Sequence, residues 1–199
     1  MLSDNFFCYN IPMNIFPHIL NRGLAHVVRF SSIPQHFPES VAEHSFYTAY
    51  YVSLLCDILE KADIEINREK AVTMALIHDT EEMFSGDILT PFKHYSNEVK
   101  ETIQKVNREV IPQVYEGLPK DMKEKYIALW NEDSNGESME AKIVKVADRL
   151  SLLSKCAEEV KVGNGYFENI YESQLKLLKD YDASWWQKIK EQVLPKSAA

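Results

Sequence analysis

Helical spacing of apolar residues runs through most of the chain and constrains its fold more than any other feature. After the run Ser40-Val41-Ala42-Glu43, core-type residues recur every three or four positions, at His44, Thr48, Tyr51, Leu55 and Leu59. That run is typical of a capping box, so a helix is predicted from there to about Ala62. Runs with two-residue alternation around a tight turn are absent, and only 6 Gly and 8 Pro interrupt 199 residues. The sequence therefore predicts an all-α fold, a helical bundle.

The same spacing predicts further helices at 68–84, 97–110, 120–130, 137–162, 168–178 and 184–193. The first of these would carry His78 and Glu82 one turn apart on one face. The second is expected to end before Pro112, because proline disfavours helix at the preceding residue. The length fits a single domain over 1–199, with a core at about 21–162 and C-terminal helices packed on it.

Charge and cysteine content exclude several classes of protein. The chain has 22 Lys and Arg against 30 Asp and Glu, a net charge of −8, with no basic run, so polymeric nucleic acid and anionic membranes are not expected partners. The three cysteines, Cys8, Cys56 and Cys156, form no C-x-x-C pair and are odd in number, which favours a reducing compartment. Without a basic signal region or a long apolar run, we expect a cytoplasmic protein.

Four metal-capable side chains interrupt otherwise apolar helical faces. They are His44, the pair His78-Asp79, and Asp148. Two imidazoles and two carboxylates suit one divalent ion of the Mn, Fe, Co, Ni or Zn type better than Ca or Mg, which prefer oxygen alone. The ligands lie on three predicted helices, as in bundles that hold a metal between facing helices.

Ordinary structural interpretations of these residues stay open. An inward histidine is often only a hydrogen-bonded core residue, and His-Asp pairs occur by chance. Asp148 lies on a buried stripe, where an unpaired charge is costly, although Arg149 is available as its ion-pair partner. An alternative interpretation of Glu82 is a solvated residue at the edge of a core stripe.

Together these residues resemble a known family. His44 within Ala42-Glu43-His44-Ser45, the pair His78-Asp79, and Ala147-Asp148 match the H…HD…D signature of HD-domain metal phosphohydrolases. The resemblance is closer still to the YfbR-like 5′-deoxynucleotidases, whose additional positions are matched here by Asn21-Arg22, Glu82, Gly86-Asp87 and Thr90-Pro91. It covers about 21–157.

The resemblance implies an all-α HD domain, a homodimer, that binds one divalent ion and hydrolyses the phosphate ester of deoxynucleoside 5′-monophosphates. In it, Glu82 orients or deprotonates the attacking water, and Asp87 lies beside the leaving 5′ oxygen and the sugar. Arg22 clamps the phosphate, and Thr90 belongs to the substrate-binding set. A surface position for Arg22 and a turn-forming role for Asp87 are the plainer alternatives.

One departure from the family pattern bears on selectivity. Known members carry a Trp after the Asn-Arg pair that helps to reject the ribose 2′-hydroxyl, whereas this chain has Gly23. The loop 30–39 is also longer, and it offers Phe30 or Phe37 as replacement bulk. Deoxy selectivity is therefore open.

Two other functions compete with the monophosphatase. A deoxynucleoside triphosphohydrolase or nucleotide pyrophosphatase on the same site would need extra basic residues, for which Lys93, His94 and Lys100 are candidates. A non-catalytic HD module that binds metal or nucleotide would be expected to lack Glu82 or a ligand, and here every position is filled.

Overall fold

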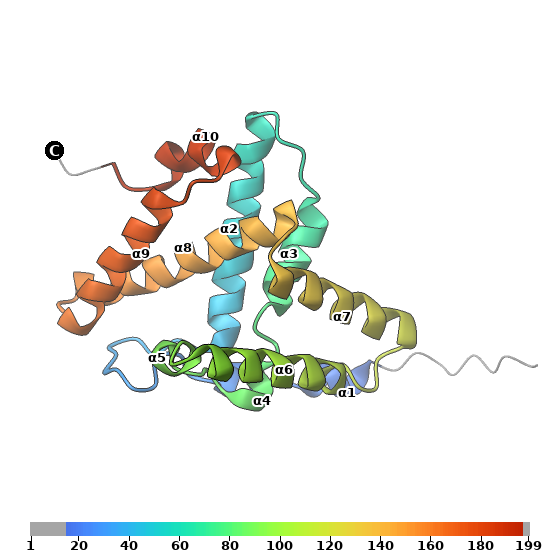
Figure 1. The fold of residues 1–199 in the computed structure, drawn as a ribbon. Helices are drawn as coiled ribbons and strands as arrows, with labels where there is room; N and C mark the ends of the chain where they lie inside the picture. Colours follow the sequence, from blue (N-terminus) through green and yellow to red (C-terminus); the bar gives the residue numbers. More distant parts are fainter. Residues whose placement is uncertain (1–14, 197–199) are drawn as a thin grey trace, which may run out of the picture.

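The computed structural model describes residues 15–196, and within that part of the chain regular structure is helical (Figure 1). An isolated antiparallel bridge between Val28 and Ser40 is the only β pairing recorded there. The elements are α1 (Phe16–Leu20), η1 (Gly23–His26), α2 (Val41–Lys61), α3 (Arg68–Ile77), α4 (Glu82–Ser85), α5 (Thr90–Lys93), α6 (Asn97–Val114), α7 (Lys120–Asn135), α8 (Met139–Lys161), η2 (Gly165–Phe167), α9 (Glu168–Asp180) and α10 (Ser184–Val193). The predicted all-α class is confirmed.

The main core lies where α2, α3 and α8 pack against one another. Helix α8 crosses α2 in Figure 1, and α3 lies alongside both. Fully buried side chains from all three helices meet there, among them Leu59, Met74 and Ile143. Helices α9 and α10 add Leu178, Trp186 and others to the same core. Each fully buried aliphatic side chain contributes about 1.5–3 kcal/mol.

The start of α2 confirms the predicted capping box. The Ser40 hydroxyl accepts a hydrogen bond from the Glu43 backbone N–H, and the Glu43 carboxylate accepts one from the Ser40 N–H at 2.7 Å. The helix ends at Lys61, one residue from the predicted end. This cap fixes the first turn of α2, and His44 follows it directly.

The predicted continuous helix over 68–84 is wrong. Helix α3 ends at Ile77, and α4 begins anew at Glu82. The cause is local. The His78 Nδ1 donates a hydrogen bond to the Ala75 carbonyl at 2.8 Å, and the Thr80 hydroxyl donates one to the Ile77 carbonyl at 2.8 Å. Side chains that bond the carbonyls of the last turn compete with continuation of the helix. His78 and Glu82 therefore do not share one helical face.

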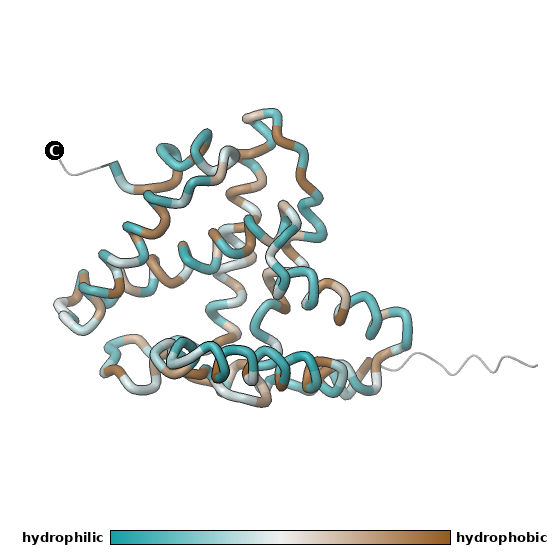
Figure 2. The backbone as a smooth tube through the Cα atoms, viewed as in Figure 1, coloured by the Kyte–Doolittle hydropathy of each residue, from teal (hydrophilic) through white to brown (hydrophobic). Residues whose placement is uncertain are grey.

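Two other helices, α6 and α7, extend several residues past their predicted ends. Helix α6 continues through Pro112 to Val114, because proline removes only one N–H donor and the buried residues Ile111 and Tyr115 hold the last turn against Trp130. Helix α7 extends to Asn135 and ends at Gly136, whose φ of +68° suits a glycine cap. Figure 2 shows hydrophobic and hydrophilic residues alternating along α6 and α9, as expected for helices with one exposed face.

The long loop before α2 is pinned to the far end of α8 by one buried carboxylate. Glu159 Oε1 accepts hydrogen bonds from the Phe37 N–H at 2.9 Å and from Lys155 at 2.7 Å. Its Oε2 accepts bonds from the His36 N–H at 3.0 Å and from Asn164 at 2.8 Å. Glu159 is fully buried, and both of its oxygens accept two hydrogen bonds. These bonds hold the loop against α8.

Cys56 and Cys156 are free and buried, whereas Cys8 lies outside the described residues. Between residues 15 and 196, none of the helices has the length and apolar character needed to cross a membrane.

Candidate metal centre

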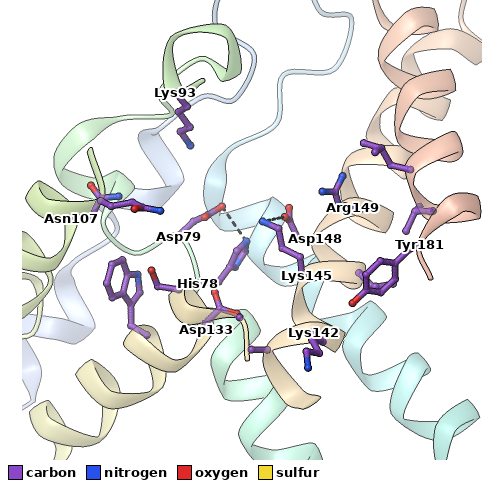
Figure 3. A pocket seen from close by; sticks show the side chains of 18 of the residues that line it. His78, Asp79, Lys93, Asn107, Asp133, Lys142, Lys145, Asp148, Arg149 and Tyr181 are labelled. Atoms are coloured by element: carbon purple, nitrogen blue, oxygen red, sulfur yellow. Dashed lines mark ion pairs between the residues drawn. The ribbon is translucent and has the colours of Figure 1, made fainter. Parts of the chain in front are cut away.

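The four predicted metal ligands converge where α2, the end of α3 and the middle of α8 meet. The His44 Nε2 lies 3.3 Å from the His78 Nε2 and 3.3 Å from the Asp148 Oδ1. The Asp79 Oδ2 lies 3.1 Å from the His78 Nε2 and 3.6 Å from the His44 Nε2. Figure 3 shows His78, Asp79 and Asp148 turned toward one another. The fold thus brings His44 into contact with His78, which is 34 positions away in the sequence, and with Asp148, which is 104 positions away.

The outer nitrogens of both histidines are already hydrogen-bonded. The His78 Nδ1 lies 2.8 Å from the Ala75 carbonyl, which only accepts, so Nδ1 carries the proton. The His44 Nδ1 lies 2.9 Å from the Ser151 hydroxyl. Both rings therefore direct Nε2 inward, and a proton on Nδ1 leaves the Nε2 lone pair free to bind a metal.

Charge in the cluster favours a bound cation. Burial alone would lower the pKa of His78, but the carboxylates of Asp79 and Asp148 outweigh it and raise that pKa to about 10. Despite burial, His78 holds the pKa of Asp79 below its usual range, and the hydrogen bond to His44 together with the charge of Lys145 does the same for the pKa of Asp148. Two partly buried, ionised carboxylates this close together favour a compensating positive charge between them.

The donor set fits a divalent transition metal. His44, His78 and Asp79 each offer one ligand atom within 4.8 Å of the others. Asp148 is outside this group of three, but its Oδ1 lies 3.3 Å from the His44 Nε2. Two nitrogen and two oxygen donors match the preferences of Mn, Fe, Co, Ni or Zn.

Glu82 lies at the start of α4 and is buried, with 4% of its surface exposed. Its interpretation as a solvated residue is therefore wrong. Oε1 accepts a hydrogen bond from Lys93 at 3.1 Å, whereas Oε2 is buried and has no hydrogen-bond partner among residues 15–196. Burial, followed by the charge of Asp79, raises the pKa of Glu82 to about 8.

The three predicted substrate residues are not joined to the cluster. Arg22 is the exposed N-cap residue of η1, and its side chain makes no hydrogen bond or ion pair with the residues that the structure describes. Asp87 Oδ2 accepts a hydrogen bond from the Phe30 N–H at 3.1 Å, so it holds the long loop. Thr90 is the exposed first residue of α5.

A cavity of about 780 Å³ opens beside the cluster, between α6, α7, α8 and α9. His78, Asp79 and Asp148 lie at its wall, and Figure 3 shows Lys93 and Lys145 on two sides of them. Lys145 pairs with Asp148 at 3.6 Å. Arg149, the partner considered for Asp148 in the sequence, instead donates to Gln174 at 3.2 Å. The cavity has the size of a nucleotide site.

Two residues with a place in this site were not singled out from the sequence. Ser151 supports His44, and its signal was a polar residue three positions after Asp148 on the same buried stripe. Glu81 accepts a hydrogen bond from the Trp130 ring N–H at 2.8 Å, and burial together with Asp79 raises its pKa to about 7. Its partner on α7 gives no sequence signal.

Sequence comparisons place the chain among known proteins. The model of the family described as 5′-deoxynucleotidase YfbR-like matches residues 16–196. A 5′-deoxynucleotidase of Erwinia tasmaniensis is 33% identical over 131 residues, covering 65% of each chain. This chain therefore spans about two thirds of the length of the curated relatives that it matches.

Solved structures share the fold. An HD-domain phosphohydrolase from Listeria innocua superposes with a TM-score of 0.75 at 25% identity, over 89% of this chain and 87% of that one. The cyanophage S-2L HD phosphohydrolase DatZ, bound to dA and one catalytic Zn²⁺, gives 0.60 at 18% identity, over 85% and 89%. With a family match over nearly all the described residues and an H…HD…D cluster in place, the chain belongs to the YfbR-like 5′-deoxynucleotidase family.

Proposed function

We propose that this protein is a metal-dependent phosphohydrolase that removes the 5′-phosphate from deoxynucleoside monophosphates. One observation carries the proposal: the inward nitrogen of His78 and one oxygen each of Asp79 and Asp148 lie within 3.6 Å of the His44 Nε2, beside a nucleotide-sized cavity. The names of the relatives support this substrate class over triphosphates.

In this proposal His44, His78, Asp79 and Asp148 hold one divalent transition-metal ion. Such an ion supplies a Lewis acid that polarises the phosphoryl group. The Zn²⁺ of the cyanophage neighbour supports a transition metal, without selecting among Co, Mn, Zn, Fe and Ni. Ser151 and the Ala75 carbonyl keep the two rings oriented.

Glu82 is the proposed general base. Its buried Oε2 has no donor among the described residues, which suits a group that accepts a proton from water. Asp87 as an orienting group, and Arg22 and Thr90 as substrate contacts, rest on the family resemblance. Arg22, before η1, and Thr90, at the start of α5, are both exposed and so are accessible to a substrate.

A homodimer and a cytoplasmic location complete the proposal. Exposed apolar side chains on the outer face of α2 support self-association, namely Phe46, Tyr47, Tyr50 and Leu54. Two buried free thiols suit a reducing compartment.

The test is phosphate release after metal stripping and reloading. Protein freed of metal is given Co²⁺, Mn²⁺, Zn²⁺ or Mg²⁺ and is assayed with dNMP, NMP, dNTP and pyrophosphate. We expect dNMP hydrolysis with a transition ion and little with Mg²⁺. Triphosphate release from dNTP as the main activity would favour the triphosphohydrolase, and pyrophosphate release from dNTP would favour the pyrophosphatase. No hydrolysis with metal bound would favour a binding module.

A further inference from the structure

Lys93 and Glu82 form a contact at the edge of the candidate site, outside the metal cluster itself. The Lys93 Nζ lies 3.1 Å from Glu82 Oε1, and the Glu82 side chain is 5% exposed against 37% for Lys93. Glu82 Oε2 is buried and has no hydrogen-bond partner in the described chain. One oxygen of the carboxylate is held and the other is free.

A sharp turn brings this pair together. Helix α4 ends at Ser85 and is capped by Gly86, which has a φ of +70° and donates its N–H to the Glu82 carbonyl at 2.9 Å. Glycine adopts this conformation without the cost that a side chain would add. Helix α5 follows and ends at Lys93, so an 11-residue separation closes into one contact.

Lys93 reaches from this carboxylate into the cavity. It lines the same cavity wall as His78 and Asp79, and Figure 3 shows it on the Asp79 side. Burial and Asp79 disfavour the ionised form of Glu82, and Lys93 is the strongest group that opposes them. A lysine that binds one carboxylate oxygen restrains the side chain and leaves the second oxygen available.

We propose that Lys93 is a positioning residue, which anchors Glu82 through Oε1 so that Oε2 faces the attacking water. The inference rests on the proposed function. In the step, Oε2 takes a proton from water while the water oxygen forms a bond to phosphorus. The bond from phosphorus to the 5′ oxygen breaks, its electron pair stays on that oxygen, and solvent supplies the proton that completes the alcohol.

The test compares Lys93→Met and Lys93→Arg with Lys105→Met, an exposed lysine of α6, as the control. Lys93→Met is expected to lower kcat for dAMP by about 10- to 100-fold, with KM and bound metal changed less than about twofold. Lys93→Arg should restore most of kcat, because a guanidinium also reaches the carboxylate. Lys105→Met should leave all three quantities unchanged.

A double-variant cycle shows whether the effect passes through Glu82. In a Glu82→Gln background, Lys93→Met should cost less than about threefold more in kcat. A loss in that background as large as in wild type, or a rise in KM with kcat unchanged, would overturn the proposal and make Lys93 a phosphate contact.

Measuring Tm for the same variants tests the Lys93–Glu82 contact independently of the proposed function. Lys93→Met leaves a buried carboxylate unpaired, so Tm should fall by about 2–4 °C with Glu82 present and by less than about 1 °C in the Glu82→Gln background. If wild type hydrolyses no nucleotide, the proposed function fails, and this cycle still reports whether Lys93 holds Glu82. Equal Tm losses in both backgrounds would reject the contact.

Discussion

The imidazole of His44 is held by Ser151, whose hydroxyl lies 2.9 Å from the His44 Nδ1 across the interface of α2 and α8. Both residues are buried, so water does not replace this bond easily. The bond fixes the ring with Nε2 toward His78, Asp79 and Asp148.

Removing this support should weaken metal binding. We predict that Ser151→Ala lowers the affinity for Co²⁺ or Zn²⁺ by about 10- to 100-fold, as is usual when a ligand histidine loses its outer partner. The measurement is metal titration by calorimetry. Ser154→Ala is the matched control, because that serine lies one turn further along α8 and is exposed. Equal affinities for wild type and Ser151→Ala would show that Ser151 does not orient the ligand.

Glu82 should separate metal binding from turnover. We predict that Glu82→Ala retains the ion but loses about 10²- to 10⁴-fold in kcat, because its role is to take a proton from water. Metal content and dAMP hydrolysis are measured on the same sample. Loss of the ion together with activity would instead make Glu82 a ligand.

The buried carboxylate of Glu159 should make stability depend on pH. Despite burial, its bonds to Lys155, His36, Asn164 and Phe37 lower the pKa of Glu159 to about 2. The unfolded chain binds this proton near pH 4.5. The stabilisation is therefore fully present above about pH 4.5 and is lost as the pH falls toward 2.

The variant Glu159→Gln should remove this stabilisation. We expect a loss of about 3–5 kcal/mol in the free energy of unfolding at pH 7, because Lys155 is left buried beside a neutral amide. Urea unfolding at pH 7 and pH 3 should show the gap between wild type and variant narrowing at low pH. Glu158→Gln, at an exposed neighbouring position, should change stability by less than about 0.5 kcal/mol. A gap that is constant with pH would contradict this account.

A test of deoxy selectivity at Gly23 must also take Met83 into account. A Cβ on Gly23 would lie 3.1 Å from the Met83 Sδ, so any side chain there must displace this thioether. We predict that Gly23→Trp combined with Met83→Ala raises the ratio of kcat/KM for dAMP over AMP by about 1–3 kcal/mol in transition-state terms. Gly23→Trp alone should give a smaller rise. A wild-type ratio that is already high and unaffected by either variant would assign the selectivity to the loop 30–39.

Much of the fold and the metal cluster could be predicted because local patterns determine them. The capping box at Ser40 and the apolar stripe behind His44 depend on residues within a few turns. The break after Ile77 could not be predicted, because two side chains compete for carbonyls that the helical pattern assigns to the backbone. The Lys93–Glu82 contact requires the turn at Gly86. Two of the residues that bind Glu159, His36 and Phe37, lie more than 120 positions away in the sequence. Such contacts depend on tertiary packing, which spacing along the chain does not encode.

Metal stoichiometry in purified protein tests the central claim most directly. The His78→Ala variant is compared with wild type and with His94→Ala, which changes an exposed histidine outside the cluster. Elemental analysis after reloading with Co²⁺ should give about one ion per chain for wild type and His94→Ala, and much less for His78→Ala. Retention of the same stoichiometric metal by His78→Ala would contradict the account, because the ion would then be bound elsewhere than between His44, His78, Asp79 and Asp148.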